Sequence, residues 1–497
     1  MSLAMVRARA ALGIDAPSVD VEVHLGGGLP SFSIVGLPNT ALREARDRVR
    51  GALTTSGFEF PRRRITVNLS PADLPKDGAR FDLAIALGIL AASGQLKPAS
   101  LQGGVFSAEL ALSGALRPVP GTLPVAVQCT QASEWLVVAA DNGEEAALGG
   151  ARVYAAAHLL DVCAHLRASP SLVPVTAPST GAQRPNSPDL ADVRGQHRAR
   201  RALEIAAAGG HSLLFCGPPG SGKSMLAARL PGLLSPMTHH EALESAAIHS
   251  VAKGRIDATA WGQRPFRQPH HTASSRALTG GGRPPRPGEI SLAHHGVLFL
   301  DELPEFPRDA LEALREPLET GEIHVARVGT QLRFPARFQL VAAMNPCPCG
   351  YLGEQHTDCR CAPNQVRQYQ NRISGPLLDR FDMQVDVPRL PPTELEACAP
   401  GECTATVAAR VATTRRHQQD AYGKAAAGLV GDELERHSAL DPQGQSVLRH
   451  ATEHFALSAR AWHRCRRLAR TIADLEGSDT IRERHIAEAL GYRKTVG

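Results

Sequence analysis

Residues 217–224 have the types and spacing that bind the phosphate groups of a nucleotide. They are Gly217, Pro218, Pro219, Gly220, Ser221, Gly222, Lys223 and Ser224. The glycines let backbone N–H groups turn toward phosphate oxygens, and Lys223 adds a positive charge for the β- and γ-phosphates. The Ser224 hydroxyl is placed to ligate Mg²⁺. A fortuitous glycine-rich turn is the alternative, but a strand pattern before the loop and a helix pattern after it favour phosphate binding.

Two acidic residues and an asparagine follow apolar strand patterns further along the chain. Asp301 and Glu302 come directly after the apolar residues 297–300, and Asn345 follows the apolar residues 340–343. Asp301 can hold Mg²⁺ through water, while Glu302 can orient and deprotonate the attacking water. Alone, such acids are common and an asparagine after a strand is more often a turn former. Beside a phosphate loop, we interpret Glu302 and Asn345 as catalytic and Asp301 as a nucleotide and magnesium ligand.

Four cysteines within a short stretch have the composition of a metal site. They are Cys347, Cys349, Cys359 and Cys361. Four thiolates that close a short loop suit tetrahedral Zn²⁺. Free thiols, an iron–sulfur cluster and a disulfide are the alternatives, and His356 could replace one thiolate. The sequence therefore predicts a structural Zn²⁺ that stiffens a loop near the nucleotide or near a central pore.

The first part of the chain mixes strand and helix patterns. Residues 19–25 and 65–69 alternate apolar and polar side chains as half-buried strands do, and residues 41–53 have apolar positions at helical spacing. These patterns predict an α+β domain at residues 1–167. Residues 168–188 are rich in proline, serine and threonine, which predicts a linker.

The remainder of the chain divides into an alternating part and a helical part. Residues 189–393 alternate helices with uniformly apolar strands such as 213–215. This pattern predicts an α/β core around a parallel sheet that is buried on both faces. Residues 394–497 predict helices with arginine-rich faces, including one at 459–475.

Composition limits the classes of protein that are possible. The 497 residues are 43% hydrophobic and 21% charged, which supports a sizeable core and excludes wholesale disorder. The net charge of +5 permits a nucleic-acid partner, but aromatic residues, at 4%, are too few for an extensive base-stacking surface. No apolar run approaches the ~18 residues that cross a membrane, and no secretory signal pattern begins the chain. We therefore expect a cytoplasmic protein with no membrane partner.

The order and spacing of these motifs resemble those of AAA+ ATPases. Residues 192–196, 288–294 and 378–382 resemble the magnesium-chelatase ATPase subunit and the MCM helicases in particular. Nearly the whole chain, with its cysteine stretch, is similar to the YifB/ComM family of chelatase-like AAA+ proteins. The resemblance implies ATP and Mg²⁺ as cofactors, an AAA+ core at residues 189–393 and a chelatase-type helical lid at residues 394–497.

The resemblance also implies a homohexamer whose active sites lie between subunits. Arg380 resembles the arginine finger that reaches the γ-phosphate of the neighbouring subunit, and Arg460 resembles the second sensor of the lid. A finger supplied in trans is worth ~10³–10⁵ in rate, so activity would require assembly. Residues 321–334 look like a hairpin that faces the pore in related motors, and Arg327 and Arg333 are the expected contacts to DNA phosphates. A surface salt bridge is the alternative role of Arg380 and Arg460.

The first domain resembles the Lon-protease-like domain through residues 74–82. In active Lon proteases the matching run continues to a serine nucleophile, where this sequence has Arg80. The lysine that acts as the base aligns with Leu123. A nucleophile–base mechanism needs both groups, so the resemblance implies that peptidase activity is absent. A DNA-binding or ring-organising role is the remaining interpretation.

These interpretations favour a hexameric DNA motor. Through the family resemblance, the expected work is that of a helicase and branch-migration factor that acts on single-stranded or branched DNA and promotes homologous recombination during natural transformation. A chelatase-type motor, an ATP-dependent protease and a nucleotide-gated adaptor on a protein partner are the alternatives. Chelatase ATPase subunits lack the front domain and the cysteine cluster, and Arg80 and Leu123 oppose proteolysis. Residues 268–271 (Gln-Pro-His-His) have no assigned role.

Overall fold

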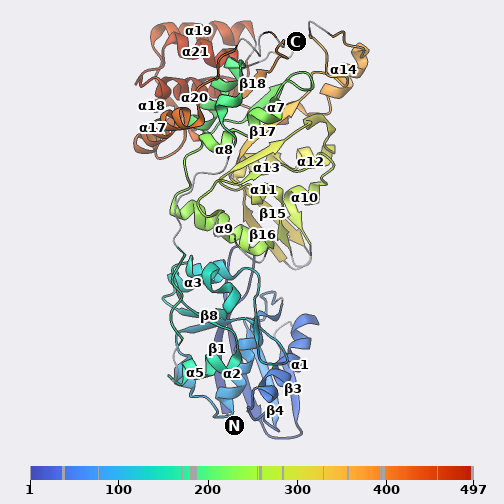
Figure 1. The fold of residues 1–497 in the computed structure, drawn as a ribbon, viewed down its shortest axis with the longest axis vertical. Helices are drawn as coiled ribbons and strands as arrows, with labels where there is room; N and C mark the ends of the chain where they lie inside the picture. Colours follow the sequence, from blue (N-terminus) through green and yellow to red (C-terminus); the bar gives the residue numbers. More distant parts are fainter. Residues whose placement is uncertain are drawn as a thin grey trace.

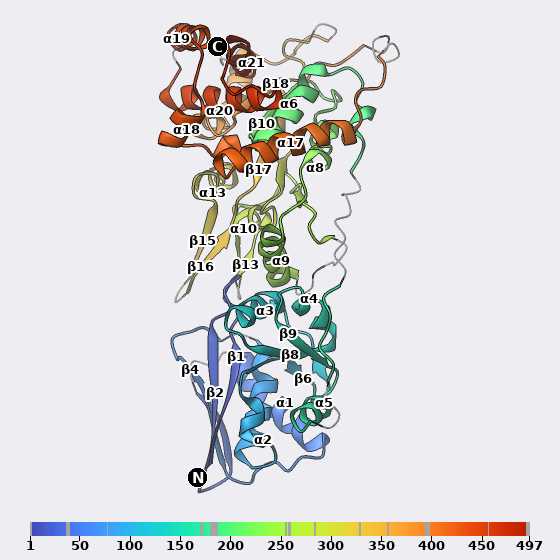
Figure 2. The same cartoon turned by 90° about the vertical axis from the view of Figure 1, so that its left-hand side faces the viewer.

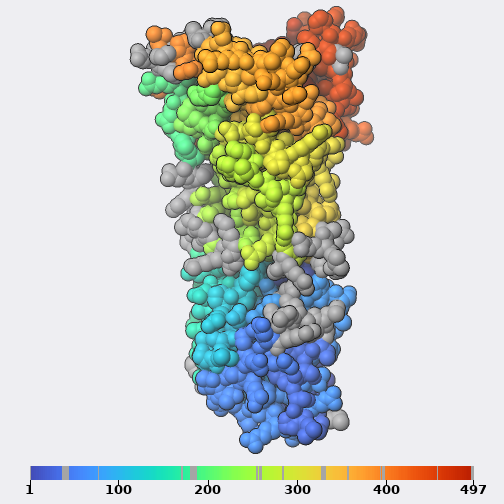
Figure 3. Space-filling model, turned by 90° about the vertical axis from the view of Figure 1, so that its right-hand side faces the viewer, coloured from blue at the N-terminus to red at the C-terminus, as the bar shows by residue number. Residues whose placement is uncertain are grey.

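The computed structural model of the chain has three regions that follow one another along its long axis (Figure 1). The N-terminal domain lies at one end, the α/β core in the middle and the C-terminal helices at the other end; Figure 3 shows the same order on another face. The structure describes residues 2–35, 40–76, 78–168, 172–178, 187–253, 256, 260–282, 285–327, 330–354, 357–391, 393, 398–455 and 457–493. None of the helices in these ranges is long and apolar enough to cross a bilayer.

A mixed seven-stranded sheet of order β3-β4-β2-β1-β5-β8-β9 forms the N-terminal domain. Its strands are β1 (Ser2–Arg9), β2 (Ser18–Gly26), β3 (Ser31–Val35), β4 (Arg64–Ser70), β5 (Gly104–Ser107), β8 (Trp135–Ala139) and β9 (Arg152–Ala156), with a small ribbon of β6 (Glu109–Leu110) and β7 (Leu116–Arg117). Its helices are α1 (Thr40–Thr55), α2 (Asp82–Ala92), α3 (Thr122–Gln131), α4 (Gly143–Ala147) and α5 (Leu159–Leu166). Alternate residues of β2 are buried, as the period of two predicts. Helix α2 is buried along its whole length, and Gly88 lets it approach Val23 closely.

Part of the predicted linker lies along the N-terminal domain. The backbone N–H of Val175 donates to the carbonyl of Val153 in β9 at 2.8 Å. Leu172 and Val175 pack against the hydrophobic clusters of this domain. These two apolar side chains explain the contact, which the proline- and serine-rich composition does not predict. Residues 169–171 and 179–186 of the linker lie outside the described residues.

The core is built on a five-stranded sheet of order β11-β14-β17-β10-β18. Its strands are β10 (Leu213–Cys216), β11 (Phe266–Arg267), β14 (Val297–Leu300), β17 (Gln339–Met344) and β18 (Met383–Asp386). Every neighbouring pair is parallel, and β14 and β17 are buried throughout. The prediction of a parallel sheet buried on both faces is confirmed. Because the strands are parallel, the residues that follow β10, β14 and β17 meet at one edge of the sheet.

Helices cover both faces of this sheet. They are α6 (His197–Gly209), α7 (Lys223–Ala227), α8 (Leu230–Leu233), α9 (His239–Lys253), α10 (Ser275–Thr279), α11 (Glu289–Leu292), α12 (Arg308–Glu312), α13 (Arg315–Thr320), α14 (Pro363–Gln370) and α15 (Gly375–Leu378). Two short antiparallel ribbons accompany them, β12 (Gly280–Gly281) with β13 (Arg286–Pro287) and the hairpin of β15 (Glu322–Arg327) with β16 (Thr330–Pro335). The predicted hairpin at 321–334 is confirmed.

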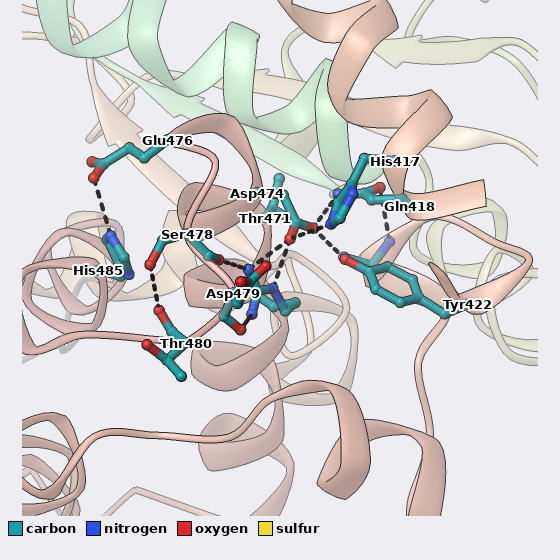
Figure 4. A network of polar contacts seen from close by, with 12 residues as sticks. His417, Gln418, Tyr422, Thr471, Asp474, Glu476, Ser478, Asp479, Thr480 and His485 are labelled. Carbon is teal, nitrogen blue, oxygen red and sulfur yellow. Dashed lines mark hydrogen bonds and ion pairs between the residues drawn. The ribbon is translucent and has the colours of Figure 1, made fainter. Parts of the chain in front are cut away.

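The C-terminal region consists of helices, and we call it the lid after the role that the resemblance predicts. They are α17 (Thr404–Tyr422), α18 (Gly431–His437), α19 (Pro442–His454), α20 (Ala459–Leu475) and α21 (Glu483–Gly491). The buried carboxylate of Asp474 on α20 accepts hydrogen bonds from Gln418 at 2.9 Å, from the Tyr422 hydroxyl at 2.5 Å and from the Arg470 guanidinium at 2.7 Å (Figure 4). Because Gln418 and Tyr422 belong to α17, this network fixes α20 against α17. The helices predicted at 41–53 and 459–475 are confirmed as α1 and α20.

Helix α9 joins the core to the N-terminal domain. Ala247 of α9 packs in one apolar cluster with Leu123 of α3. The backbone N–H of Gly121 donates to the Ser250 carbonyl at 3.2 Å, and the Ser250 hydroxyl donates to the Glu145 carboxylate. Figure 2 shows α9 above α3, with the β15–β16 hairpin reaching from the core toward the N-terminal domain. The joint therefore combines apolar packing with buried hydrogen bonds.

Candidate nucleotide-binding site

The phosphate loop connects the carboxyl end of β10 to the start of α7. The Lys223 ammonium donates to the carbonyls of Gly217 and Pro218, each at 2.8 Å. A Cβ on Gly217 would lie 2.1 Å from the Val387 carbonyl, so only glycine allows the start of the loop to lie this close to the Val387 backbone. The Ser221 hydroxyl is buried and has no partner among the described residues, which is a polar atom left for a ligand. These donors fit the triphosphate of ATP.

Burial lowers the pKa of Lys223, although the nearby charge of Asp301 opposes that shift. The side chain is only 8% exposed and rests on backbone carbonyls. Phosphate oxygens would offer this ammonium a stronger, charge-assisted partner than the carbonyls do. The Asn345 amide oxygen accepts from the same ammonium at 3.1 Å, so the asparagine at the end of β17 does reach the phosphate loop.

The residues expected to hold Mg²⁺ are adjacent. The Ser224 hydroxyl donates to the Asp301 carboxylate at 2.5 Å, and the second oxygen of that carboxylate accepts from the Glu302 backbone N–H at 2.9 Å. A hydroxyl and a carboxylate are the hard oxygen donors that Mg²⁺ takes together with water and phosphate. The donor set therefore fits the ion. Ser224 in α7 and Asp301 after β14 are neighbours because the loop after β10 and the end of β14 lie at the same edge of the sheet.

Glu302 has a partner that the motifs do not reveal. Its carboxylate lies 2.9 Å from Nδ1 of His271, which belongs to the unassigned segment 268–271. Glu302 also has a φ of 54°, the left-handed region that a residue with a side chain rarely adopts. Sequence reasoning missed His271. The available signal was its position: the segment with His271 follows β11, and β11 pairs with β14, which ends just before Asp301.

Arg380 and Arg460 lie together at a different place from the phosphate loop. Both guanidiniums contact one carboxylate oxygen of Glu319, Arg460 at 3.5 Å. They line a cavity of about 880 Å³ together with Ser212 and Gln339. Ser212 precedes β10 and Gln339 begins β17, so this cavity lies at the amino ends of the strands. The phosphate loop lies at the carboxyl ends, roughly 16 Å away along an extended β10.

The four predicted zinc ligands converge. The thiol sulfurs of Cys347 and Cys349 lie 3.4 Å apart, and each lies 3.6 Å from the sulfur of Cys359. The sulfur of Cys361 joins them, so that all four lie within 4.8 Å of one another. Tetrahedral Zn–S bonds of ~2.3 Å place sulfurs ~3.8 Å apart, so the group has the size that Zn²⁺ requires. His356 lies outside the described residues.

The cysteine cluster lies against the phosphate loop, and its thiols differ in pKa: lost hydration and the neighbouring cysteines raise the pKa of Cys359 and Cys361, whereas the pKa of Cys349 is lowered. Backbone N–H groups of Tyr351 and Arg360 donate to Cys349 and lower the pKa of that thiol to about 6. Gly350 has a φ of 85°, and a Cβ there would meet Pro219 at 2.6 Å. The loop that carries the cysteines thus contacts the loop that would hold phosphate.

A second group of potential metal ligands is better explained without a metal. Glu244 lies 2.7 Å from Nε2 of His295 and 3.4 Å from Nε2 of His294. Nδ1 of His294 accepts the backbone N–H of Arg337 at 2.9 Å, so the proton of the neutral ring is on Nε2. A ring nitrogen that carries a proton cannot ligate a metal. We interpret the group as hydrogen bonds that fasten α9 to the residues before β14.

The two Lon-like positions of the N-terminal domain are buried by other contacts. The Arg80 guanidinium donates to the Pro120 carbonyl at 2.8 Å, which brings it next to the segment that contains Leu123. Leu123 is fully buried in the joint with α9. That the domain lacks peptidase activity stays a prediction.

The two arginines expected to bind DNA are on the β15–β16 hairpin. Arg333 is exposed and pairs with Glu322 at 3.3 Å across the two strands. Arg327 is paired with Thr330 in the strand register, at the tip of the hairpin, but its side chain lies outside the described residues. Their DNA contacts stay predictions.

The parallel sheet, the phosphate loop after β10 and the acidic pair after β14 define a chelatase-like AAA+ core, a class that indicates ATPase activity with ATP and Mg²⁺. The family descriptions agree: "Magnesium chelatase, subunit ChlI" matches residues 189–395, "Subunit ChlI of Mg-chelatase" residues 21–142, and "Magnesium chelatase, subunit ChlI C-terminal" residues 401–493. Full-length relatives narrow the assignment. The chain belongs to the YifB/ComM family of magnesium-chelatase-like AAA+ proteins.

Three relatives illustrate this membership. The chain is 50% identical to the competence protein ComM of Haemophilus influenzae, over 100% of this chain and 98% of that protein. It is 49% identical to the uncharacterized protein YifB of Escherichia coli, over 99% and 97% of the two chains. The magnesium-chelatase 38 kDa subunit of Cereibacter sphaeroides is 27% identical over 39% of this chain.

Proposed function

We propose that this protein is an ATP-driven, hexameric DNA motor that moves branched or single-stranded DNA and promotes homologous recombination during natural transformation. The observation that carries the proposal is the separation of Arg380 and Arg460 from the phosphate loop of the same chain. A complete hydrolytic site then needs two subunits. The name of the relative in Haemophilus influenzae, a competence protein, supports the cellular role.

The residues of the phosphate site supply the steps of hydrolysis. The phosphate loop and Lys223 bind and neutralise the β- and γ-phosphates, and Asn345 orients the γ-phosphate. Glu302 orients the attacking water and accepts its proton. Mg²⁺, held by Ser224 and Asp301, supplies charge to the triphosphate when bound.

The interface between subunits supplies the remaining charge. Arg380 of one subunit reaches the γ-phosphate bound by the next, and Arg460 of the lid acts beside it. A closed ring satisfies this head-to-tail arrangement for every subunit, which favours a homohexamer. The β15–β16 hairpin projects from the same core and carries Arg327 and Arg333 to the DNA backbone.

A structural Zn²⁺ bound by Cys347, Cys349, Cys359 and Cys361 stabilises the loop beside the phosphate site. We expect protein purified without chelator to contain about one equivalent of zinc per chain. Replacing Cys359 with serine should release the metal, while Cys398→Ser, a cysteine outside the cluster, should retain it. Atomic absorption measures both. Less than half an equivalent in the unsubstituted protein would contradict zinc binding.

The decisive experiment measures ATP hydrolysis and unwinding of branched DNA with the same preparations. Lys223→Ala should lose nucleotide binding, whereas Glu302→Gln should bind ATP but hydrolyse it about 10²–10⁴-fold more slowly. Arg380→Ala should bind ATP and assemble, yet hydrolyse at a rate about 10³-fold lower. An Arg380→Ala protein with intact hydrolysis would exclude catalysis between subunits, and ATPase activity without any DNA movement would exclude the motor.

A further inference from the structure

One cavity between the core and the lid is lined by many basic side chains. Eight basic side chains line it: Arg264, Arg337, Arg380, Arg415, Lys424, Arg460, Arg464 and Arg467. Three carboxylates oppose them: Glu241, Glu319 and Asp382. The basic side chains outnumber the lining carboxylates by five, and one of them, Lys424, pairs with Glu433 just outside the lining at 2.8 Å. Such a concentration of like charge in a concave site attracts anions.

Part of this charge is uncompensated. No described carboxylate lies within ion-pair distance of Arg337, Arg415 or Arg467. Arg415 donates to the Ala207 carbonyl at 3.0 Å, and its burial together with the charge of Arg264 lowers its pKa to about 10. The guanidinium stays charged at neutral pH, and its lowered pKa shows that keeping the charge in this buried place is unfavourable. An anion inside the cavity would lower this cost.

Glu319 is the one carboxylate that Arg380 and Arg460 share. Arg380 donates to it and to the Pro376 carbonyl at 2.9 Å, and the Arg380 side chain is only 8% exposed. The Glu319 side chain is 53% exposed, so it approaches the two arginines from the open side of the cavity. A carboxylate and a phosphate present oxygens to a guanidinium in similar geometry.

We propose that the Glu319 carboxylate occupies the place of a phosphate group and holds Arg380 and Arg460 in the free subunit. It is displaced when the triphosphate of a nucleotide bound to a second copy of this chain enters the cavity. This inference rests on the proposed motor. Glu319 is the penultimate residue of α13, and Gly321 joins α13 to β15. Displacement therefore frees the last turn of α13 from the two arginines at the point where the chain enters the β15–β16 hairpin, which would couple arrival of the neighbour's phosphate to the hairpin.

The test measures binding of inorganic tripolyphosphate by calorimetry to the full chain with Lys223→Ala, which disables its own phosphate loop. Adding Glu319→Gln should tighten binding about fivefold, because the competing charge is removed. Glu319→Asp, which keeps the charge with a shorter reach, should give a smaller gain. Adding Arg380→Ala and Arg460→Ala should cancel the gain.

The matched control is Glu316→Gln on the same helix. The Glu316 carboxylate is exposed and forms no ion pair with the described residues, so this substitution should leave the affinity unchanged. Equal affinities of the Glu319→Gln and Glu316→Gln proteins would overturn the inference, as would a gain that survives loss of both arginines. A gain for single-stranded oligonucleotide without one for tripolyphosphate would assign the cavity to DNA instead and also overturn it. Because anion binding needs no hydrolysis, an inactive wild-type ATPase would reject the proposed function without deciding this test.

Discussion

At the scale of single residues, the site consists of charges held by specific partners. Lys223 rests on carbonyls, Ser224 on Asp301, and Glu302 on His271. Each of these partners is one that a bound nucleotide, metal ion or water would replace or rearrange. A ligand must therefore compete with these internal contacts, whereas the Ser221 hydroxyl has no partner among the described residues to give up.

His271 is expected to restrain Glu302. The contact with His271 occupies the carboxylate that has to orient the attacking water, so His271→Ala should raise ATP hydrolysis in the absence of DNA by about two- to fivefold. Steady-state phosphate release measures this change. In the Glu302→Gln background the same substitution should have no effect. A lower rate in His271→Ala with Glu302 intact would instead assign His271 to catalysis.

His294 should make stability depend on pH. Burial, and then the charge of His295, lower its pKa from 6.5 to about 4 in the folded protein. A depressed histidine pKa favours folding above the unfolded value of 6.5, and that contribution is lost as the pH falls toward 4. Between pH 7 and pH 5 the loss should be about 2 kcal/mol in the free energy of unfolding.

Denaturant unfolding at the two pH values measures this loss. His294→Asn, whose amide oxygen can accept the Arg337 N–H in place of Nδ1, should reduce the difference between pH 7 and pH 5. His454→Asn, at an exposed position of α19, serves as the control and should retain it. Equal pH dependence in all three proteins would contradict the assignment.

At the scale of elements, a few helices connect the nucleotide site to the N-terminal domain and hold the lid together. Helix α9 packs on α3 with one face and fastens to His294 and His295, just before β14, with another. Strand β14 ends at Asp301 and Glu302. The lid is fixed differently, through the buried Asp474 network between α17 and α20 (Figure 4).

Disrupting that network should destabilise the lid. Asp474→Asn leaves the buried Arg470 without its carboxylate, which should cost about 3 kcal/mol in the free energy of unfolding. Thermal unfolding followed by circular dichroism measures the change. Asp420→Asn, at an exposed position of α17, is the matched control and should be neutral within about 0.5 kcal/mol. Equal melting temperatures for the two variants would show that the network contributes no net stability.

Much of the fold was predictable because its signals are local. Uniformly apolar strands predicted the parallel sheet, and helical spacing predicted α1 and α20 to within a residue or two of their ends. The phosphate loop, Asp301 and Asn345 were predictable as neighbours because parallel strands end at one edge. His271, Glu319 and the pairing of Val175 with β9 were not, because each depends on contacts between segments that no local pattern specifies.

At the scale of the whole molecule, the two halves of the proposed active site face opposite edges of one sheet. This arrangement predicts complementation between inactive variants. Lys223→Ala lacks a working phosphate loop, and Arg380→Ala lacks the finger, but a mixed ring contains junctions at which both are intact. Equal mixing should restore about a quarter of the wild-type rate per site, since each junction draws its two halves at random.

The recovered ATPase rate is measured as phosphate release after the two variants have exchanged subunits under native conditions. Mixing Lys223→Ala with a second phosphate-loop variant, Ser224→Ala, is the control and should restore nothing, because no junction regains an intact loop. If the first mixture stayed as inactive as its components, each chain would have to complete its own site.

Leu123 also bears on how this architecture can change over evolutionary time. Leu123, which aligns with the base of Lon-type peptidases, packs against α9 where the N-terminal domain contacts the core. A lysine at this position would place a charge in that buried apolar contact and weaken the packing between the two domains. A Lon-type dyad would therefore require substitutions at both Arg80 and Leu123, and the substitution at Leu123 would also disturb the packing that joins the N-terminal domain to the core.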